Sequence, residues 1–203
     1  MACLSRTGEE WAPEDVDAVA LVSQYGRPYS AVLRHAQVRL QLRRDWAPKA
    51  CAAVARMAAG AARGCAGCTW YRHEPAPEGW GVGGFFGPPY GLLQGGLPGL
   101  GAAVESENAA LRPVTVGVAA FIAGSTDFFI GTVDHSEWGG SFTAFAQVPA
   151  EDMEAVAAVP MVPYRNSTDS YNFTTRWLLE RAPFKLQPLR RAELSSEMEA
   201  GLR

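Results

Sequence analysis

Short segments rich in β-branched and aromatic residues, separated by glycine and proline, recur through the chain. Such residues fit a pleated, half-buried surface, and Gly and Pro clusters bound strands. Many short strands with few helices favour a closed barrel or a sandwich whose ends are covered by helices. The segments expected to be strands are 37–42, 69–72, 113–122, 127–133, 142–148 and 184–189.

Two segments predict helices. The first runs from Pro48, which fits a first helical turn, to Gly60, which can end a helix. The second is expected over 150–159, and a further helical turn over 175–181. One face of the first helix carries apolar residues at helical spacing, which indicates core packing: Cys51, Val54, Ala55 and Ala58.

The length of 203 residues suits one domain with tails. We expect a lead-in over 1–30, in which 15–23 forms either a short helix or a strand. The domain itself is expected over 31–190, interrupted by a glycine- and proline-rich loop over 76–89. Residues 191–203 read as a polar tail.

Charge and hydropathy exclude several classes of partner. The net charge is −3 and no Lys/Arg cluster follows a phosphate backbone, so we expect no nucleic-acid partner. The sequence has no run of eighteen apolar residues, so we expect no membrane span.

The cysteines leave alternatives open. Cys65 and Cys68 form a C-x-x-C pair, but no second pair or well-spaced histidine accompanies it, so we expect no metal. A redox motif would require a βαβ pattern, which is missing. Two interpretations remain: buried small residues, or a structural disulfide from Cys51 to Cys65 or Cys68.

Two of the three asparagines, Asn166 and Asn172, begin N-glycosylation sequons in a polar, loop-like stretch. We expect both to be exposed. Together with a disulfide they would indicate the lumen of the secretory pathway or secretion. The alternative is a cytoplasmic or ciliary assembly.

Six motifs occur in an order that resembles the cyclophilins, a family of peptidyl-prolyl cis-trans isomerases. The resemblance covers about residues 34–159, with 184–189 as a plausible closing strand. It implies a mainly β fold, a closed eight-stranded antiparallel barrel capped by two helices, with a substrate groove on its outer face and no cofactor. The motifs are VRLQLRRDWAPKACAAV, WYRHEP, LLQGG, VESEN, STDFFIGT and SEWGGSFTAFAQV.

The resemblance assigns roles to five residues. Arg72 falls on the catalytic arginine, and Gln94 on the glutamine that steadies it and contacts substrate. Phe129 falls on the floor of the proline pocket, Trp138 on its rim, and Leu92 on a pocket methionine. The implied partners are proline-containing segments.

Other positions depart from the family pattern. The loop over 76–89 is inserted beside the expected groove, and we expect it to narrow or partly cover that groove. We therefore expect weak or absent isomerase activity; the alternative is a non-catalytic peptide-binding or structural subunit of a larger assembly. We expect His73 and His135 to be solvated and assign them no role. The departures are Tyr71, Gly91, Ala123, Asp127 and Gly139.

Overall fold

The computed structural model describes residues 12–25, 34–60, 65–107 and 112–190. Eight strands close into a barrel in the order β1-β10-β3-β4-β6-β5-β7-β2, and every neighbouring pair is antiparallel. This confirms the mainly β fold and the closed eight-stranded barrel. The barrel strands are β1 (Ala18–Tyr25), β2 (Arg34–Leu42), β3 (Thr69–Glu74), β4 (Leu92–Gly96), β5 (Val118–Ile122), β6 (Asp127–Gly131), β7 (Phe142–Gln147) and β10 (Ala182–Leu189).

The barrel begins earlier than expected. Strand β1 lies within 1–30, the segment expected to be a lead-in, yet it pairs with both β10 and β2. Its small apolar residues fit a helix or a strand, so local sequence did not decide between them. The segment is a strand because it forms hydrogen bonds along both edges and because Val19 and Leu21 are buried.

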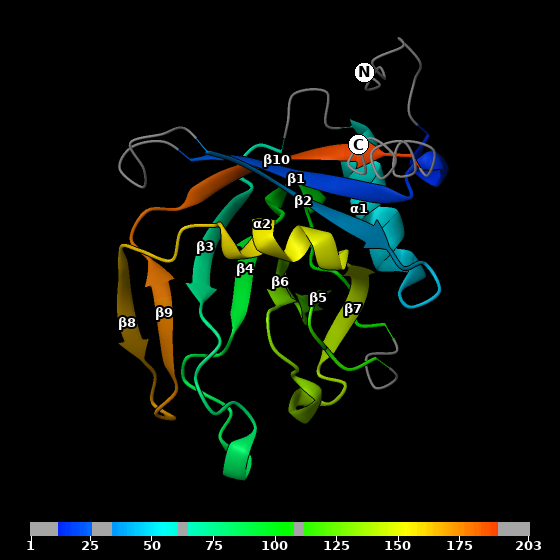
Figure 1. Ribbon diagram of the computed structural model, residues 1–203. Coiled ribbons are helices and arrows are strands. Elements are labelled where there is room, and N and C mark those ends of the chain that lie inside the picture. The colour runs from blue at the N-terminus through cyan, green and yellow to red at the C-terminus, as the bar shows by residue number, and fades with distance from the viewer. Residues whose placement is uncertain (1–11, 26–33, 61–64, 108–111, 191–203) are drawn as a thin grey trace.

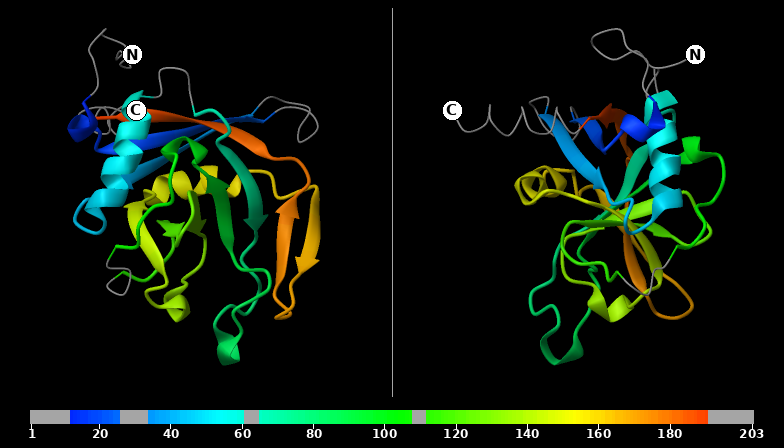
Figure 2. Two further views of the ribbon diagram at one scale, coloured as in Figure 1. Left: turned by 180° about the vertical axis from the view of Figure 1, so that it is seen from behind. Right: turned by 90° about the vertical axis from the view of Figure 1, so that its right-hand side faces the viewer.

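Two helices lie on opposite sides of the barrel (Figure 2). Helix α1 (Pro48–Gly60) buries the predicted face, including Val54 and Ala58, against the core. Helix α2 (Met153–Ala157) follows a 3-10 turn over Ala150–Asp152. Arg39 on β2 fixes this segment: its Nε and Nη2 donate to the two carboxylate oxygens of Asp152, each at 2.8 Å.

The barrel interior is filled by aromatic rings. Trp70 lies 4.5 Å from Phe184 between ring centroids, and Phe121 lies 4.4 Å from Phe145. The indole Nε1 of Trp70 donates to the buried Ser23 hydroxyl at 3.2 Å, so its polar atom is satisfied inside the core. Packing of this kind fixes the strand positions that build the outer face.

A hairpin of β8 (Tyr164–Thr168) and β9 (Thr174–Leu178) stands beside β3, outside the barrel (Figure 1). The helical turn expected over 175–181 is therefore wrong: pairing with β8 and packing on β3 override the local helix propensity. Asn166 and Asn172 both lie on this hairpin and are exposed, as expected. Their glycosylation, and a lumenal or secreted location, stay predictions that glycosidase treatment of the native protein would test.

The disulfide joins Cys65 to Cys68, with a Cα–Cα distance of 5.4 Å. The expected pairing of Cys51 with either residue is wrong. Cys51 is a free, buried thiol that donates to the carbonyl of Phe145 at 3.1 Å, because it lies on the core face of α1. Burial raises the pKa of the Cys51 thiol to about 12, since the thiolate would lose its hydration.

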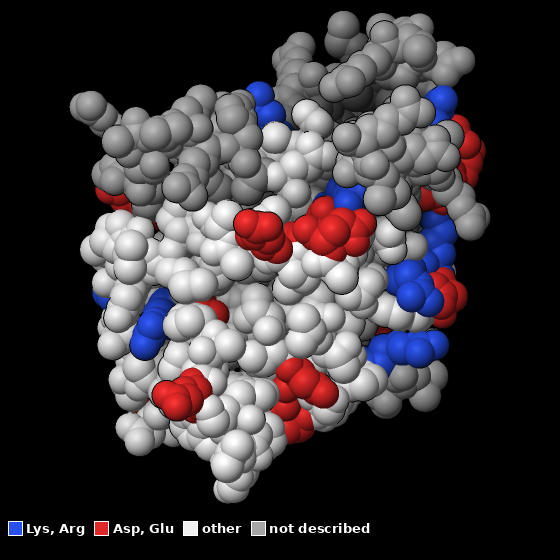
Figure 3. Space-filling view, in the orientation of Figure 1, with Lys and Arg blue, Asp and Glu red and all other residues white. Residues whose placement is uncertain are grey.

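Charged side chains on the face drawn in Figure 3 lie in separate groups with uncharged surface between them. No helix among the described residues has the length and apolar character needed to cross a membrane. The described part of the chain also contains no group of three or more His, Cys, Asp or Glu placed to hold a metal ion.

Candidate functional site

A groove of about 270 Å³ lies on the outer face of the barrel. All five residues assigned by resemblance line it. Register explains why three of them meet: Arg72 on β3 is opposite Gln94 on β4, which is opposite Phe129 on β6. The residues that line the groove are Arg72, Tyr90, Leu92, Gln94, Ile122, Phe129, Trp138, Phe142, Phe173 and Thr175.

A β-bulge aims Arg72 at the groove. Trp70 points into the barrel, so strict alternation along β3 would turn Arg72 inward as well. The register shifts between Trp70 and Arg72, which places Tyr71 and Arg72 both on the outer side. The sequence motif predicted the position of Arg72, whereas the bulge that orients it became visible only in the structure.

The floor of the groove is aromatic. Phe128 belongs to the barrel core and its neighbour Phe129 faces outward, as alternation predicts. Phe129 meets Trp138 and Phe142 edge-to-face, with ring centroids 5.6 and 4.9 Å apart. Only 2% of Phe129 is exposed, so the floor is shaped before any ligand arrives.

Two side chains hold the guanidinium of Arg72. Its Nη1 donates to the Gln94 side-chain oxygen at 3.1 Å, and its Nε donates to Glu74 at 2.8 Å. The rings of Tyr90 and Trp177 flank it, 5.6 and 5.9 Å from Cζ. Arg72 is therefore fixed in position at the groove wall.

Glu74 is the site residue that sequence reasoning missed. Its side chain is 0% exposed, and besides Arg72 it accepts from the backbone N–H of Arg176 at 2.8 Å and of Tyr90 at 2.7 Å. One carboxylate thus joins β3, β9 and the segment just before β4. The available signal was its spacing: positions 72 and 74 share one face of a strand.

Gln94 is steadied in turn by Tyr71. Its Nε2 donates to the Tyr71 hydroxyl at 2.7 Å, and the Tyr71 ring stacks on Trp177 with centroids 5.8 Å apart. Burial raises the pKa of Tyr71 well above its usual value, and the negative charge of Asp127 adds to this. Two departures from the family pattern, Tyr71 and Asp127, therefore serve to build this wall.

The remaining departures change the wall elsewhere. Gly91 has φ +55°, and a Cβ there would approach the Val133 side chain to 2.7 Å, so a larger residue would be strained and would require Val133 to move. Ala123 and Gly139 are exposed and do not line the groove. Tyr90 and Phe142 supply aromatic surface to the groove, so its wall is rebuilt in part and not simply lost.

The inserted loop does not cover the groove, contrary to expectation. None of residues 76–89 lines it. Trp80 packs edge-on against His135, with centroids 5.0 Å apart, and donates to the carbonyl of Asp134 at 2.8 Å. The loop is thus anchored beyond the end of β6, and the β8–β9 hairpin supplies Phe173 and Thr175 to the groove instead.

Both histidines expected to be solvated are buried. His135 stacks on Trp138, with centroids 3.7 Å apart, and its Nε2 donates to the carbonyl of Gly91 at 3.2 Å. It therefore supports the rim of the groove. His73 donates from Nδ1 to the carbonyl of Val159 at 2.8 Å. The alternation of β3 after the bulge turns His73 inward, which the sequence did not reveal.

His73 makes stability depend on pH. Burial lowers the pKa of His73 from 6.5 to about 4, so between these values the unfolded chain takes up a proton that the folded protein does not. The stability that neutral, buried His73 contributes is present above pH 6.5 and is lost as the pH falls from 6.5 toward 4. We expect about 2 kcal/mol less stability at pH 5 than at pH 7 from this residue.

Urea unfolding at both pH values measures this effect, with His73→Asn as the non-titrating control. The pH-dependent loss should be about 2 kcal/mol smaller in the variant. If the wild type and His73→Asn lose the same free energy of unfolding between pH 7 and pH 5, His73 is not the source of the pH dependence.

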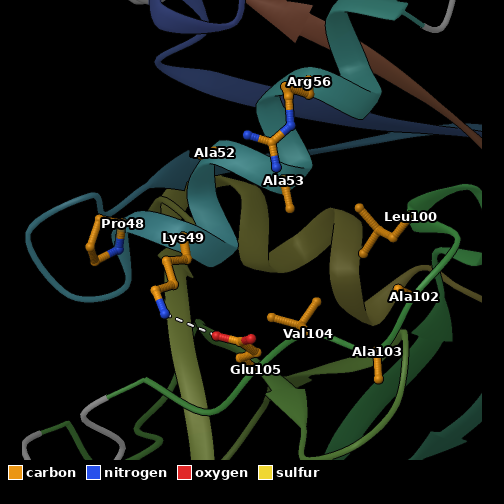
Figure 4. A pocket seen from close by; sticks show the side chains of 10 residues that line it. All are labelled: Pro48, Lys49, Ala52, Ala53, Arg56, Leu100, Ala102, Ala103, Val104 and Glu105. Atoms are coloured by element: carbon orange, nitrogen blue, oxygen red, sulfur yellow. Dashed lines mark hydrogen bonds and ion pairs between the residues drawn. The ribbon is translucent and has the colours of Figure 1, made fainter.

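A second cavity, of about 640 Å³, lies between α1 and residues 100–105 (Figure 4). Its lining is mostly small and apolar, and Lys49 and Glu105 pair across one end at 2.9 Å. Its lining residues include no aromatic side chain. The groove at Arg72 is therefore the better candidate site.

No protein-family model and no curated protein matches the chain. Two crystal structures of a cyclophilin-type peptidyl-prolyl cis-trans isomerase from Cryptosporidium parvum are similar in structure. One has a TM-score of 0.51 at 12% identity, covering 87% of this chain and 99% of that chain. The other, in the presence of the dipeptide Ala-Pro, has a TM-score of 0.50 at 14% identity, covering 86% and 99%. With its closed eight-stranded barrel and two helices, the protein therefore has the cyclophilin fold in a strongly diverged form.

Proposed function

We propose that this protein binds X-Pro segments in the groove at Arg72 and isomerises them weakly. The observation that carries the proposal is the guanidinium of Arg72, fixed by Gln94 beside the aromatic floor at Phe129. An apolar floor suits a proline ring, and a fixed donor beside it suits the amide that must twist.

The chemistry requires no nucleophile. Amide resonance sets a barrier of about 18–20 kcal/mol, and resonance is lost when the prolyl nitrogen becomes pyramidal. An N–H aimed at that nitrogen stabilises the twisted amide more than either planar state. Arg72 uses two N–H groups on Glu74 and Gln94, and the guanidinium has five, so three stay available to a ligand.

Two features make the expected activity weak. The Glu74 carboxylate pairs with Arg72 and offsets the charge that would stabilise the twisted amide. Ala123 carries only a methyl group and does not line the groove, so it offers no side-chain hydrogen bond to the substrate backbone. A peptide held by fewer contacts is positioned less well for the reaction.

A second candidate function is a non-catalytic peptide-binding or structural module. The same ion pair favours it, because Glu74 makes Arg72 part of the framework that holds the β8–β9 hairpin. In that case the groove would bind proline-containing segments without accelerating their isomerisation.

NMR exchange spectroscopy on an X-Pro peptide separates the two candidates. We expect cis–trans exchange faster than in the free peptide but slower than with a cyclophilin whose pocket is intact. The control is Phe129→Ala, which removes the floor and should abolish binding and return the exchange rate to that of the free peptide.

Binding without faster exchange would establish the second candidate. No binding at all would reject the proposed function and the peptide-binding form of the second candidate, and would leave a structural module. Isomerase activity as high as that of a cyclophilin with an intact pocket would contradict the expectation of weak activity.

A further inference from the structure

The β8–β9 hairpin is firmly attached beside the groove. Its strand β9 packs on β3 through the Tyr71–Trp177 stack, and the backbone N–H of Arg176 donates to the buried Glu74 carboxylate at 2.8 Å. Leu178, at the end of β9, is buried. The β8–β9 hairpin therefore holds its position relative to Arg72 before any ligand binds.

The turn at the tip of the hairpin is also fixed. The Asp169 carboxylate accepts from the backbone N–H of Tyr171 and of Phe173, both at 2.9 Å. Asn172 between them has φ +67°, a left-handed conformation that asparagine tolerates. Backbone bonds close the turn, from Asn172 to the Asp169 carbonyl and from Asp169 to the Phe173 carbonyl, both at 3.1 Å.

This ordered turn presents an aromatic side chain that the fold itself does not bury. Phe173 is 57% exposed and lines the groove, whereas Tyr171 on the same tip is 81% exposed and does not line it. Thr175 and Trp177 alternate along β9 and share one of its faces, and Phe173 directly precedes the strand. Phe173 and Thr175 line the groove, and the ring of Trp177 flanks Arg72. Strand β9 packs on β3, β3 pairs with β4 and β4 pairs with β6, so Arg72 on β3 lies between these hairpin residues and the floor at Phe129.

We propose that the hairpin is a recognition arm, and that Phe173 with Thr175 forms a subsite for a large apolar or aromatic side chain next to the proline. The inference rests on the proposed function. The subsite is continuous with the proline-binding floor and lies on the other side of Arg72, so a peptide in the groove reaches it with its neighbouring residue. Contact there would cover the exposed ring of Phe173, which favours binding.

Peptides that differ only beside the proline test the arm. The dissociation constants of a set carrying Phe, Leu or Gly on either side of one proline would be measured by NMR titration. At one of the two positions we expect Phe to bind about fivefold to tenfold more tightly than Gly.

Phe173→Ala should abolish this preference. Tyr171→Ala is the matched control, because it removes another exposed ring from the same turn that does not line the groove, and should keep the preference. Both variants should unfold at the wild-type urea concentration, since neither ring is buried.

Equal binding of the Phe and Gly peptides by the wild type would overturn the recognition arm and leave the proposed function standing. The same holds if Phe173→Ala keeps the preference. If the wild type binds none of the peptides, both the arm and the proposed function fail.

Discussion

Replacing Glu74 with alanine is expected to lower the free energy of unfolding by about 3–5 kcal/mol, because it leaves the largely buried Arg72 without its charged partner. Two backbone N–H groups, of Tyr90 and Arg176, lose their acceptor in the same step. A buried donor without a partner costs about 1–3 kcal/mol. The effect should be among the largest of any single substitution at the groove.

Urea unfolding of Glu74→Ala and Glu78→Ala measures this prediction. Glu78 is exposed in the loop that follows β3, so its removal should change stability by less than about 0.5 kcal/mol. Glu74→Gln keeps the size of the side chain but turns an NH₂ group toward a donor, and we expect an intermediate loss. A Glu74→Ala protein as stable as Glu78→Ala would contradict the role given to the carboxylate.

The sequence predicted the groove residues well because their positions depend on strand pairing. Motif order assigned Arg72, Gln94 and Phe129, and the barrel register then brings them side by side. The sequence did not reveal the role of Glu74, because a carboxylate near an arginine usually forms an ordinary surface ion pair. Its partner Arg176 is 102 residues away along the chain, and no local pattern reports such a contact.

The expectation that the loop over 76–89 narrows or partly covers the groove is wrong, and the β8–β9 hairpin lines the groove instead. The loop over 76–89 directly follows the strand that carries Arg72, so its closeness in sequence favoured it. Trp80 instead anchors the loop to Asp134 and His135, through a hydrogen bond and a ring contact. The hairpin that lines the groove contains a segment with helix-forming residues, and only pairing of β8 with β9 makes it extended.

Arg72→Lys is expected to lower any isomerase activity at least tenfold, about 1.4 kcal/mol in the barrier, while changing peptide affinity by less than about threefold. The compact ammonium of lysine cannot donate to Glu74 and Gln94 and also present a fixed N–H to the prolyl nitrogen. The aromatic floor is unchanged, so ground-state binding should persist.

NMR exchange rates at saturating peptide, together with titrations, separate the two effects. Arg176→Lys is the control: it makes the same chemical change on the adjacent strand and keeps the backbone N–H that Glu74 accepts. Its exchange rate should match the wild type. If Arg72→Lys also leaves the rate unchanged, Arg72 is not a catalytic donor. Its retention would then be explained by the Glu74 ion pair, and the groove would be a site that binds proline without isomerising it.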